Sequence, residues 1–153
     1  MKMGAGFKIS YMFAFLKFKS TKTQSPRPDL DKGEVKRLEQ AIQVWVSEKR
    51  YRECSIRREE VASQLNTTRE FLNSYFKHVK KMDFNSWRTS LRVEDAKKLL
   101  LDRDDLPISL VGELVGFSDR SNFHRQFTKI AGCTPKQWRE SSGRPITAKS
   151  IVL

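Results

Sequence analysis

The chain contains an internal repeat, and this repeat restricts the folds that it can adopt. Trp87 is followed 51 positions later by Trp138, and Phe76 at the same interval by Phe127. Around the two tryptophans the segments FNSWR and PKQWR align, so that an arginine follows the tryptophan in both. A repeat of this length with matching aromatic residues is not expected by chance and indicates two structural units of one kind.

The second unit has the pattern of two helices joined by a tight turn. The apolar segment LVGELV ends at Gly116, where glycine permits a positive φ without steric cost. Ser118 or Asp119 can then cap the following helix by accepting its free N–H groups. Four apolar side chains of that helix share one face and predict its buried side: Phe123, Phe127, Ile130 and Ala131. This order is that of a helix-turn-helix.

The first unit follows the same order with a slip of one residue at the turn. Asn66 stands in the turn and tolerates a positive φ better than most residues. Thr67 together with Glu70 predicts a capping box. In the next helix Leu72 and Phe76 take the places of the two phenylalanines of the second unit.

The rest of the central part of the chain is also helical in pattern. Apolar residues recur at helical spacing in EVKRLEQAIQVWV, before the first unit, and in SWRTSLRVEDAKKLLLD, between the units. The second of these segments predicts a linker helix over about 84–102, roughly 25 Å long. Because no stretch alternates with period two, we predict an all-α fold of about seven helices. The long linker helix would join two helix-turn-helix subdomains. The predicted core of the fold contains Phe71, Leu72, Tyr75, Phe76, Trp87, Phe117, Phe123, Phe127 and Trp138.

The charge of the chain points to a polyanionic partner. Thirty lysines and arginines face 18 acidic residues, for a net charge of +12 and a pI of about 10. Cys54 and Cys133 are isolated, and no group of residues has the spacing of a metal site, a phosphate loop or a nucleophile with its base. We therefore expect no enzyme activity, no metal, no cofactor and no small-molecule ligand site in this chain.

Residues 34–142 resemble the DNA-binding domain of the AraC/XylS family of bacterial transcriptional regulators. The segment LVGELVGFSDRSNFHRQFTKIAGCTPKQWR is similar to the second helix-turn-helix of that family almost throughout, and LRVEDAKKLL to its linker helix. The segments TTREFLNSYF and FNSWRTSLR are most similar to members from Bacteroidetes. The resemblance implies a first helix-turn-helix at about 56–81 and a second at about 107–131, followed by a flexible tail over 143–153.

The outward faces of the two second helices are the candidate DNA-reading surfaces. Candidates for contact with bases are Glu70, Asn73 and Ser74 in the first unit, which the resemblance places toward DNA, and Ser121, Asn122, His124 and Arg125 in the second. By chemistry Asn73 suits adenine, Glu70 suits cytosine and Arg125 suits guanine. Candidates for phosphate contacts are Arg69, Lys77, Lys80, Lys129, Lys136 and Arg139. Residues with a predicted structural role are Gly116, Phe117, Gly132 and Pro135.

Several of these assignments have a structural alternative. Glu70 can serve only as a helix cap, and His124 can be a neutral donor to phosphate. Arg92 and Arg139 can pair within the domain with carboxylates such as Glu94 or Asp119. Three positions also depart from the family pattern. Gly112 replaces the usual alanine. Arg58 replaces a usually apolar residue, whose counterpart in the second unit is Ile108, and Lys81 replaces a glycine, whose counterpart is Gly132.

Residues 1–33 are basic and partly apolar, and they differ from the remainder of the chain. The run ISYMFAFLKF is too short to cross a bilayer and has no signal-peptide cleavage site. It can be a disordered tail, an interfacial anchor formed by residues 7–18, or the end of a longer membrane segment. We expect a cytoplasmic protein, or one associated with the inner membrane if the chain is the end of a longer protein.

Together these patterns predict a sequence-specific transcriptional regulator that inserts two recognition helices into successive major-groove segments of double-stranded DNA. RNA polymerase is a further expected partner. The alternative is a protein that uses the same basic helical domain for non-specific nucleic-acid binding or as a membrane-associated adaptor.

Overall fold

A computed structural model describes residues 30–141, and it is helical throughout this range with no strand. The α-helices are α2 (Lys32–Ser47), α3 (Arg58–Gln64), α4 (Arg69–Tyr75), α5 (Phe84–Asp102), α6 (Ile108–Leu114), α7 (Arg120–Ala131) and α8 (Pro135–Glu140). A 3-10 helix, η1 (Arg50–Arg52), follows α2, and a π-helical turn, η2 (Phe76–Lys80), continues α4. The predicted all-α class and the linker helix are confirmed. The predictions for residues 7–18 and for the tail lie outside the described residues.

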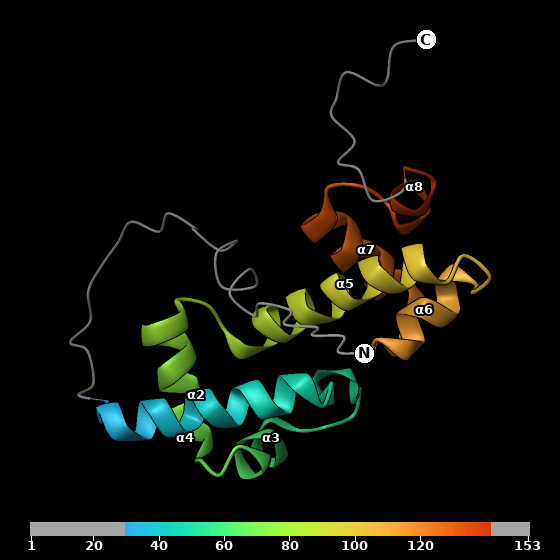
Figure 1. The fold of residues 1–153 in the computed structure, drawn as a ribbon. Helices are drawn as coiled ribbons and strands as arrows, with labels where there is room; N and C mark the ends of the chain where they lie inside the picture. The colour runs from blue at the N-terminus through green and yellow to red at the C-terminus, as the bar shows by residue number, and fades with distance from the viewer. Residues whose placement is uncertain (1–29, 142–153) are drawn as a thin grey trace, which may run out of the picture.

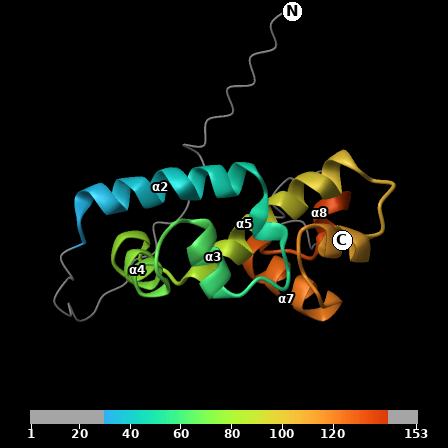
Figure 2. The same cartoon turned by 90° about the horizontal axis from the view of Figure 1, so that it is seen from below.

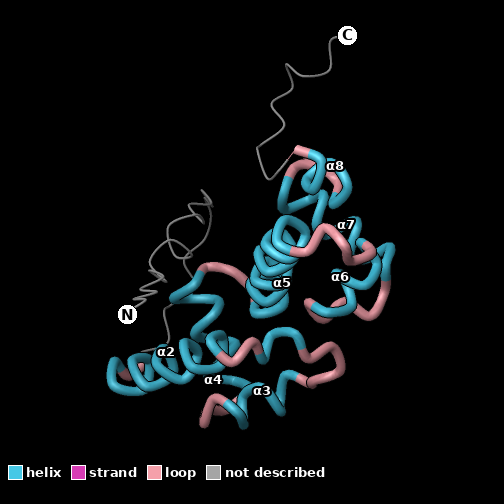
Figure 3. Tube along the Cα trace, turned by 45° about the vertical axis from the view of Figure 1, so that its right-hand side comes forward, coloured by secondary structure: helices cyan, strands magenta, loops and turns pink. Residues whose placement is uncertain are grey.

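Helix α5 connects two groups of helices. In Figure 1 it runs diagonally between α2, α3 and α4 at one end and α6, α7 and α8 at the other. Figure 3 shows the same two groups from another side, again with α5 between them. In Figure 2 helix α2 extends along one side of the molecule, with α3 and α4 next to it. No helix within residues 30–141 has the length and apolar character needed to span a bilayer.

Each group encloses its own hydrophobic core, and α5 supplies side chains to both. The first core collects Leu38, Ile42, Trp45, Tyr51, Val61, Ala62, Leu65, Leu72, Tyr75, Phe76, Phe84 and Leu91. The second collects Val93, Ala96, Leu100, Val111, Val115, Phe117, Phe123 and Phe127. The residues predicted as core lie there, with Phe71, Trp87 and Trp138 packed against it while partly exposed. A linker helix that is part of both cores cannot move without disturbing one of them.

The two turns confirm the predicted slip of one residue. Asn66 adopts a φ of 52° in the first unit and Gly116 a φ of 99° in the second. The next helix begins after Thr68 in the first unit and after Asp119 in the second, so the second turn is one residue longer. The second helices of the two units, α4 with its continuation η2 and α7, also end alike, because Lys81 and Gly132 both adopt a positive φ at their C-termini. At Lys81 a side chain therefore occupies a conformation that usually favours glycine.

The predicted capping box of the first unit is wrong. The N-cap of α4 is Thr68, whose hydroxyl accepts a hydrogen bond from the backbone N–H of Phe71. Thr67 instead lies in the turn, where its N–H donates to the carbonyl of Ala62. Glu70 stands within the first turn of α4, one position too early for a box with Thr68, and its side chain pairs with Arg69. Asp119 caps α7 as one of the two predicted alternatives.

Gly112 has a packing role that its low helix propensity hides. A Cβ atom at this position would lie 2.8 Å from Cδ1 of Phe123, a buried side chain of α7. Because glycine has no side chain, α6 can approach α7 closely. The departure from the family's alanine is therefore compensated by contact between these two helices.

The segment after α2 ties the first unit to the linker helix. Tyr51 of η1 is buried, and its hydroxyl donates to Oδ2 of Asp95 on α5 at 2.9 Å. Arg52 Nε donates to the same oxygen at 2.6 Å. The Asp95 side chain is only 9% exposed. A buried carboxylate with two donors, one of them charged, fixes η1 against α5.

Two arginines of α5 bind the backbone of the same segment. Arg88 and Arg92 both donate to the carbonyl oxygens of Tyr51 and Glu53. Burial, together with the neighbouring charge of Arg88, lowers the pKa of Arg92 to about 10, which leaves it protonated at neutral pH. Two cations thus share two carbonyl oxygens, an arrangement that holds η1 in one orientation.

The second unit meets this segment at its turn. A Cβ atom at Gly116 would lie 2.7 Å from the carbonyl carbon of Arg52 and closer still to its oxygen. The Arg92 guanidinium lies over the ring of Phe117, 5.8 Å from its centroid. We call this contact region the junction; it consists of Tyr51, Arg52, Arg88, Arg92, Asp95 and Gly116. Through it, the first unit, α5 and the second unit are packed together.

Candidate nucleic-acid interface

Helix α7 places its apolar and polar residues on different sides. Phe123 and Phe127 are buried, and Asp119 accepts hydrogen bonds from the N–H groups of Ser121 and Asn122 at its start. Ser121 and Arg125 are exposed, whereas Asn122 and His124 are half-buried. The four side chains proposed as base readers therefore lie outside the core and on the rim of this helix.

Arg125 and Asn122 form a polar pair on the surface of α7. Nη2 of Arg125 donates to Oδ1 of Asn122 at 3.0 Å. A guanidinium has five N–H donors, so most of the Arg125 donors stay available for another acceptor. The pair orients the arginine along the outer face of the helix.

His124 is less available than its sequence position suggested. Its ring packs edge-on against Phe123, and its Nε2 atom is enclosed with no hydrogen-bond partner among the described residues. A buried imidazole nitrogen of this kind needs a local rearrangement to reach phosphate or base. Its predicted roles stay predictions.

On the first recognition helix Glu70 is well exposed. Its side chain is 74% exposed and accepts a hydrogen bond from Arg69 Nε, while Arg69 Nη1 donates to Glu59 on α3. The alternative that Glu70 serves only as a cap does not hold, because Thr68 fills that role. Arg69, predicted to contact phosphate, is shared between two carboxylates in this structure.

Asn73 and Ser74 are half-buried at the outer edge of α4. Oδ1 of Asn73 accepts a hydrogen bond from Nη1 of Arg58 on α3 at 3.0 Å. Arg58 was identified from the sequence only as a departure from an apolar position. The structure brings it into contact with a candidate base reader, a role that the sequence reasoning missed.

The four lysines predicted to contact phosphate fall into two groups. Lys77, Lys129 and Lys136 are exposed. Lys80 lies over the Tyr75 ring, 5.5 Å from its centroid, and burial lowers its pKa despite the charge of Glu39. Arg120, at the start of α7, is also exposed and was not predicted, although the 51-residue repeat aligns it with Arg69.

Arg139 and Arg92 have structural roles, but the predicted carboxylate partners are wrong. Arg139 donates to the carbonyl oxygens of Leu100 and Leu106, and Arg92 to those described at the junction. Glu94 pairs with Lys97, and Asp119 caps α7. The repeat explains the common pattern, because Arg88 matches Arg139 and both bind backbone carbonyls of neighbouring segments.

The predicted structural residues behave as the turn chemistry requires. Gly116 and Gly132 have positive φ angles, Phe117 is buried, and Pro135 is the buried first residue of α8. Thr134 caps that helix and forms a capping box with Gln137.

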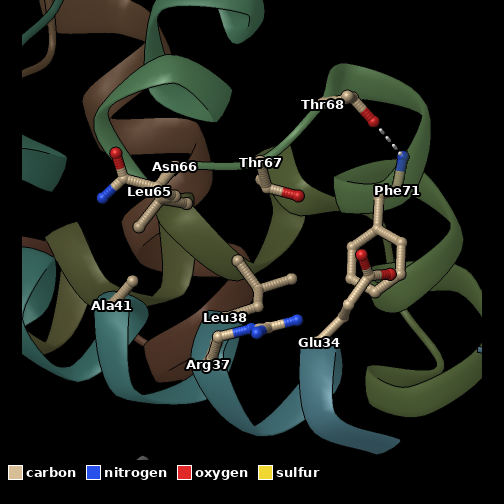
Figure 4. A pocket seen from close by; sticks show the side chains of 9 residues that line it. All are labelled: Glu34, Arg37, Leu38, Ala41, Leu65, Asn66, Thr67, Thr68 and Phe71. Carbon is tan, nitrogen blue, oxygen red and sulfur yellow. Dashed lines mark hydrogen bonds between the residues drawn. The ribbon is translucent and has the colours of Figure 1, made fainter. Parts of the chain in front are cut away.

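A depression of about 520 Å³ lies between α2 and the turn of the first unit. Figure 4 shows its walls, with Glu34 and Arg37 of α2 facing Thr67, Thr68 and Phe71. The Thr68 hydroxyl is engaged by the Phe71 N–H, as the dashed line marks. The polar groups of this depression thus belong in part to the helix cap.

A family model described as a helix-turn-helix domain matches residues 61–141, more than half of the chain. The chain belongs to the AraC-type helix-turn-helix family. The match begins in α3 and ends after α8, so it includes both recognition helices and the linker helix of this AraC-type domain.

Known AraC-type proteins are similar to parts of the chain. The arabinose operon regulatory protein of Escherichia coli K12 is 37% identical over 68 residues, which are 44% of this chain and 23% of that protein. The RCS-specific HTH-type transcriptional activator RclR of Escherichia coli K12 is 38% identical over 52 residues, or 34% of this chain and 18% of that protein. The matched region is less than a quarter of the length of these relatives.

The fold is also similar to that of solved structures. The C-terminal domain of AraT, a response regulator from Geobacillus stearothermophilus, has a TM-score of 0.60 and 30% identity, over 79% of this chain and 93% of that one. The C-terminal domain of the response regulator yesN from Fusobacterium nucleatum has a TM-score of 0.58 and 30% identity, over 66% of this chain and 96% of that one. The predicted class of a DNA-binding transcription regulator, rather than an enzyme, agrees with this family.

Proposed function

We propose that this chain recognises a specific DNA sequence by placing α4 and α7 in successive major-groove segments on one face of the duplex. The observation that supports this most is the duplication. Two helix-turn-helix units of the same construction share one linker helix, and each leaves a recognition helix with polar side chains outside its core. Recognition helices in such an arrangement need to lie about one helical turn of DNA apart, roughly 34 Å.

The two outward faces differ, which favours specific over non-specific binding. Helix α4 presents Glu70 and Asn73, and α7 presents Ser121 and Arg125. Neutralisation of phosphates alone would require only lysine and arginine. A glutamate near the phosphate backbone would be repelled, so Glu70 suits a position in the groove, where cytosine N4 can donate to it.

Exposed cations around these faces supply the phosphate contacts of the proposal. Lys77 lies in η2, the π-helical continuation of α4, Lys129 in α7 and Lys136 in α8. Regulation of transcription through contact with RNA polymerase is a further sequence-based expectation of this proposal. Association with a membrane through residues 7–18 belongs to the alternative, in which the chain is a membrane-associated adaptor. The proposed location is the cytoplasm.

Selection from a random duplex library tests the proposal. With the purified chain at about 150 mM salt, which suppresses purely electrostatic binding, the enriched sequences should contain two short blocks about one helical turn apart. A single block would mean that one of the two units is only a scaffold. Enrichment of no sequence, together with retained binding at low salt, would rule out specific recognition by this chain.

Arg125→Ala should remove discrimination at one position of the enriched site. Because one good arginine–guanine contact is worth about 1–3 kcal/mol, the preference for guanine there should fall by that amount while other positions keep theirs. The measurement is a competition titration against all four bases at each position. Lys129→Ala is the matched control from the same helix: it should weaken binding to all sequences alike. If Arg125→Ala also acts uniformly, Arg125 does not read a base.

A further inference from the structure

Arg58 occupies a position where the second unit has an apolar side chain. When the two units are aligned, Arg58, the first residue of α3, corresponds to Ile108, the first residue of α6. Arg58 is half-buried, and its Nη1 atom donates to Oδ1 of Asn73 across the α3–α4 contact. A half-buried guanidinium at a packing position is therefore attached to the recognition helix rather than to a carboxylate.

This hydrogen bond determines how the Asn73 amide is oriented. A guanidinium has N–H donors and no acceptor, so only the oxygen of the Asn73 amide, and not its NH2 group, can form a hydrogen bond with Arg58. Nδ2 of Asn73 then lies on the other branch of the amide, and none of the described residues accepts a hydrogen bond from it. Asn73 thus keeps both Nδ2 donors available, while its oxygen already accepts one hydrogen bond and is held toward Arg58.

The second recognition surface lacks such a device at the matching place. The repeat aligns Asn73 with His124, whose Nε2 atom has no partner among the described residues, and Ile108 has no group that could provide one. The Arg58–Asn73 hydrogen bond is therefore not a general feature of the two units. It belongs to the first recognition helix of this chain.

We infer that Arg58 is a positioning residue for base recognition: it holds Asn73 as a hydrogen-bond donor, so that α4 selects a keto base at this position. This inference rests on the proposed function. In the major groove guanine presents two acceptors, O6 and N7, and thymine presents O4. Adenine presents the acceptor N7 beside the donor N6, and cytosine presents the donor N4, so an amide held as a donor leaves those N–H groups without a partner. A free asparagine pairs with adenine by accepting from N6 while donating to N7. The Arg58 hydrogen bond competes for the oxygen that such a pair needs.

The surroundings of the pair are consistent with a base or sugar-phosphate edge. Arg58 and Asn73 line a surface depression of about 390 Å³ together with Lys77, Lys81, Phe76 and Met82. Arg58 and the two lysines outnumber the single carboxylate of the lining, Asp83, so the depression carries a net positive charge that suits a polyanion.

Selection experiments with variants of the full chain test the inference. Asn73→Ala first identifies the position that Asn73 reads, as the one whose preference disappears. At that position the wild-type chain should prefer guanine or thymine. Arg58→Ile, which copies the side chain of the second unit, should release the amide and shift the ratio of keto bases to adenine about tenfold toward adenine. Arg58→Lys keeps a donor and should retain much of the keto preference.

Two controls separate positioning from charge and from folding. Lys77→Gln removes one positive charge from the same depression and should weaken binding to all sequences without changing the base preference. Thermal unfolding followed by circular dichroism shows whether Arg58→Ile is folded, and Arg58→Met, with a longer flexible side chain, replaces it if it is not.

The outcomes distinguish this inference from the proposed function. If the wild-type chain enriches no two-block motif, the proposed function fails and this inference fails with it. If the motif appears but Arg58→Ile keeps the keto preference, or if wild type already prefers adenine at the Asn73 position, only the inference is overturned. The inference alone is also overturned if Asn73→Ala changes the base preference at no position of the site.

Discussion

Replacing Gly116 with alanine should lower the free energy of unfolding by about 4 kcal/mol. The residue has a φ of 99°, a conformation in which an L side chain is strained by roughly 1–2 kcal/mol. The added Cβ would also lie 2.7 Å from the Arg52 carbonyl carbon, and backbone cannot rotate away as a flexible side chain can. The clash would therefore separate the second unit from η1, and urea denaturation is the appropriate measurement.

Gly132→Ala is the matched control for this prediction. Gly132 also has a positive φ, of 77°, but a Cβ there would meet nothing within 4 Å. Its replacement should cost only the backbone strain, about 1 kcal/mol. Equal losses for the two substitutions would mean that Gly116 serves its turn alone and that its contact with Arg52 has no energetic importance.

Asp95→Ala should destabilise the domain by about 3 kcal/mol at neutral pH. The substitution removes the acceptor of both Tyr51 and Arg52 and leaves a largely enclosed guanidinium without its counter-charge. Urea denaturation monitored by tryptophan fluorescence can measure it, because Trp45 lies 6.5 Å from the Tyr51 ring. Asp105→Ala is the control: its ion pair with Arg103 is more than half exposed, so the loss should be negligible.

The contribution of Asp95 should also depend on pH. Burial by itself would raise the pKa of its carboxyl group, but the hydrogen bonds from Arg52 and Tyr51 and the Arg52 charge outweigh burial and lower it. A carboxyl group whose pKa is lower in the folded state stabilises the fold above its unfolded pKa, near 4, and this stabilisation is lost as the pH falls further. The difference between wild type and Asp95→Ala should therefore shrink between pH 7 and pH 3. A difference that stays constant would show that the carboxylate charge is unimportant.

The fold was largely predictable because its elements are set by local patterns. The spacing of Leu72, Phe76, Phe123 and Phe127 marks the buried faces of both recognition helices, and each of these side chains is 1% exposed or less. Gly116 signals the turn because few other residues accept its φ. Because the sequence is duplicated, each element is predicted from two aligned segments, and a weak pattern in one unit is supported by the other.

The errors arose where the choice depends on tertiary contacts. Thr67 and Thr68 are equivalent as N-cap residues by type, and only the actual turn decides between them. Arg92 and Arg139 were assigned carboxylate partners because charge complementarity is visible in a sequence, whereas a nearby backbone carbonyl is not. The contact of Arg58 with Asn73 was also hidden, since it depends on how α3 and α4 cross.

The junction was unforeseen for the same reason. Tyr51 and Asp95 are 44 residues apart, and no periodicity relates them. Individually their types are unremarkable: a tyrosine after a helix and an aspartate on a mostly polar stretch. Only the packing of η1 against α5 gives them a common function.

The junction has a consequence for affinity that can be expressed as an effective concentration. When one unit docks on DNA, the second is held at a fixed place, so its encounter with the neighbouring groove becomes intramolecular. A stiff connection gives a high effective concentration at the matching distance and almost none elsewhere, whereas a flexible tether spreads it over many distances. For a protein that binds through both units, the hydrogen bonds of Asp95, Arg88 and Arg92 thus determine how much the second unit adds to the first.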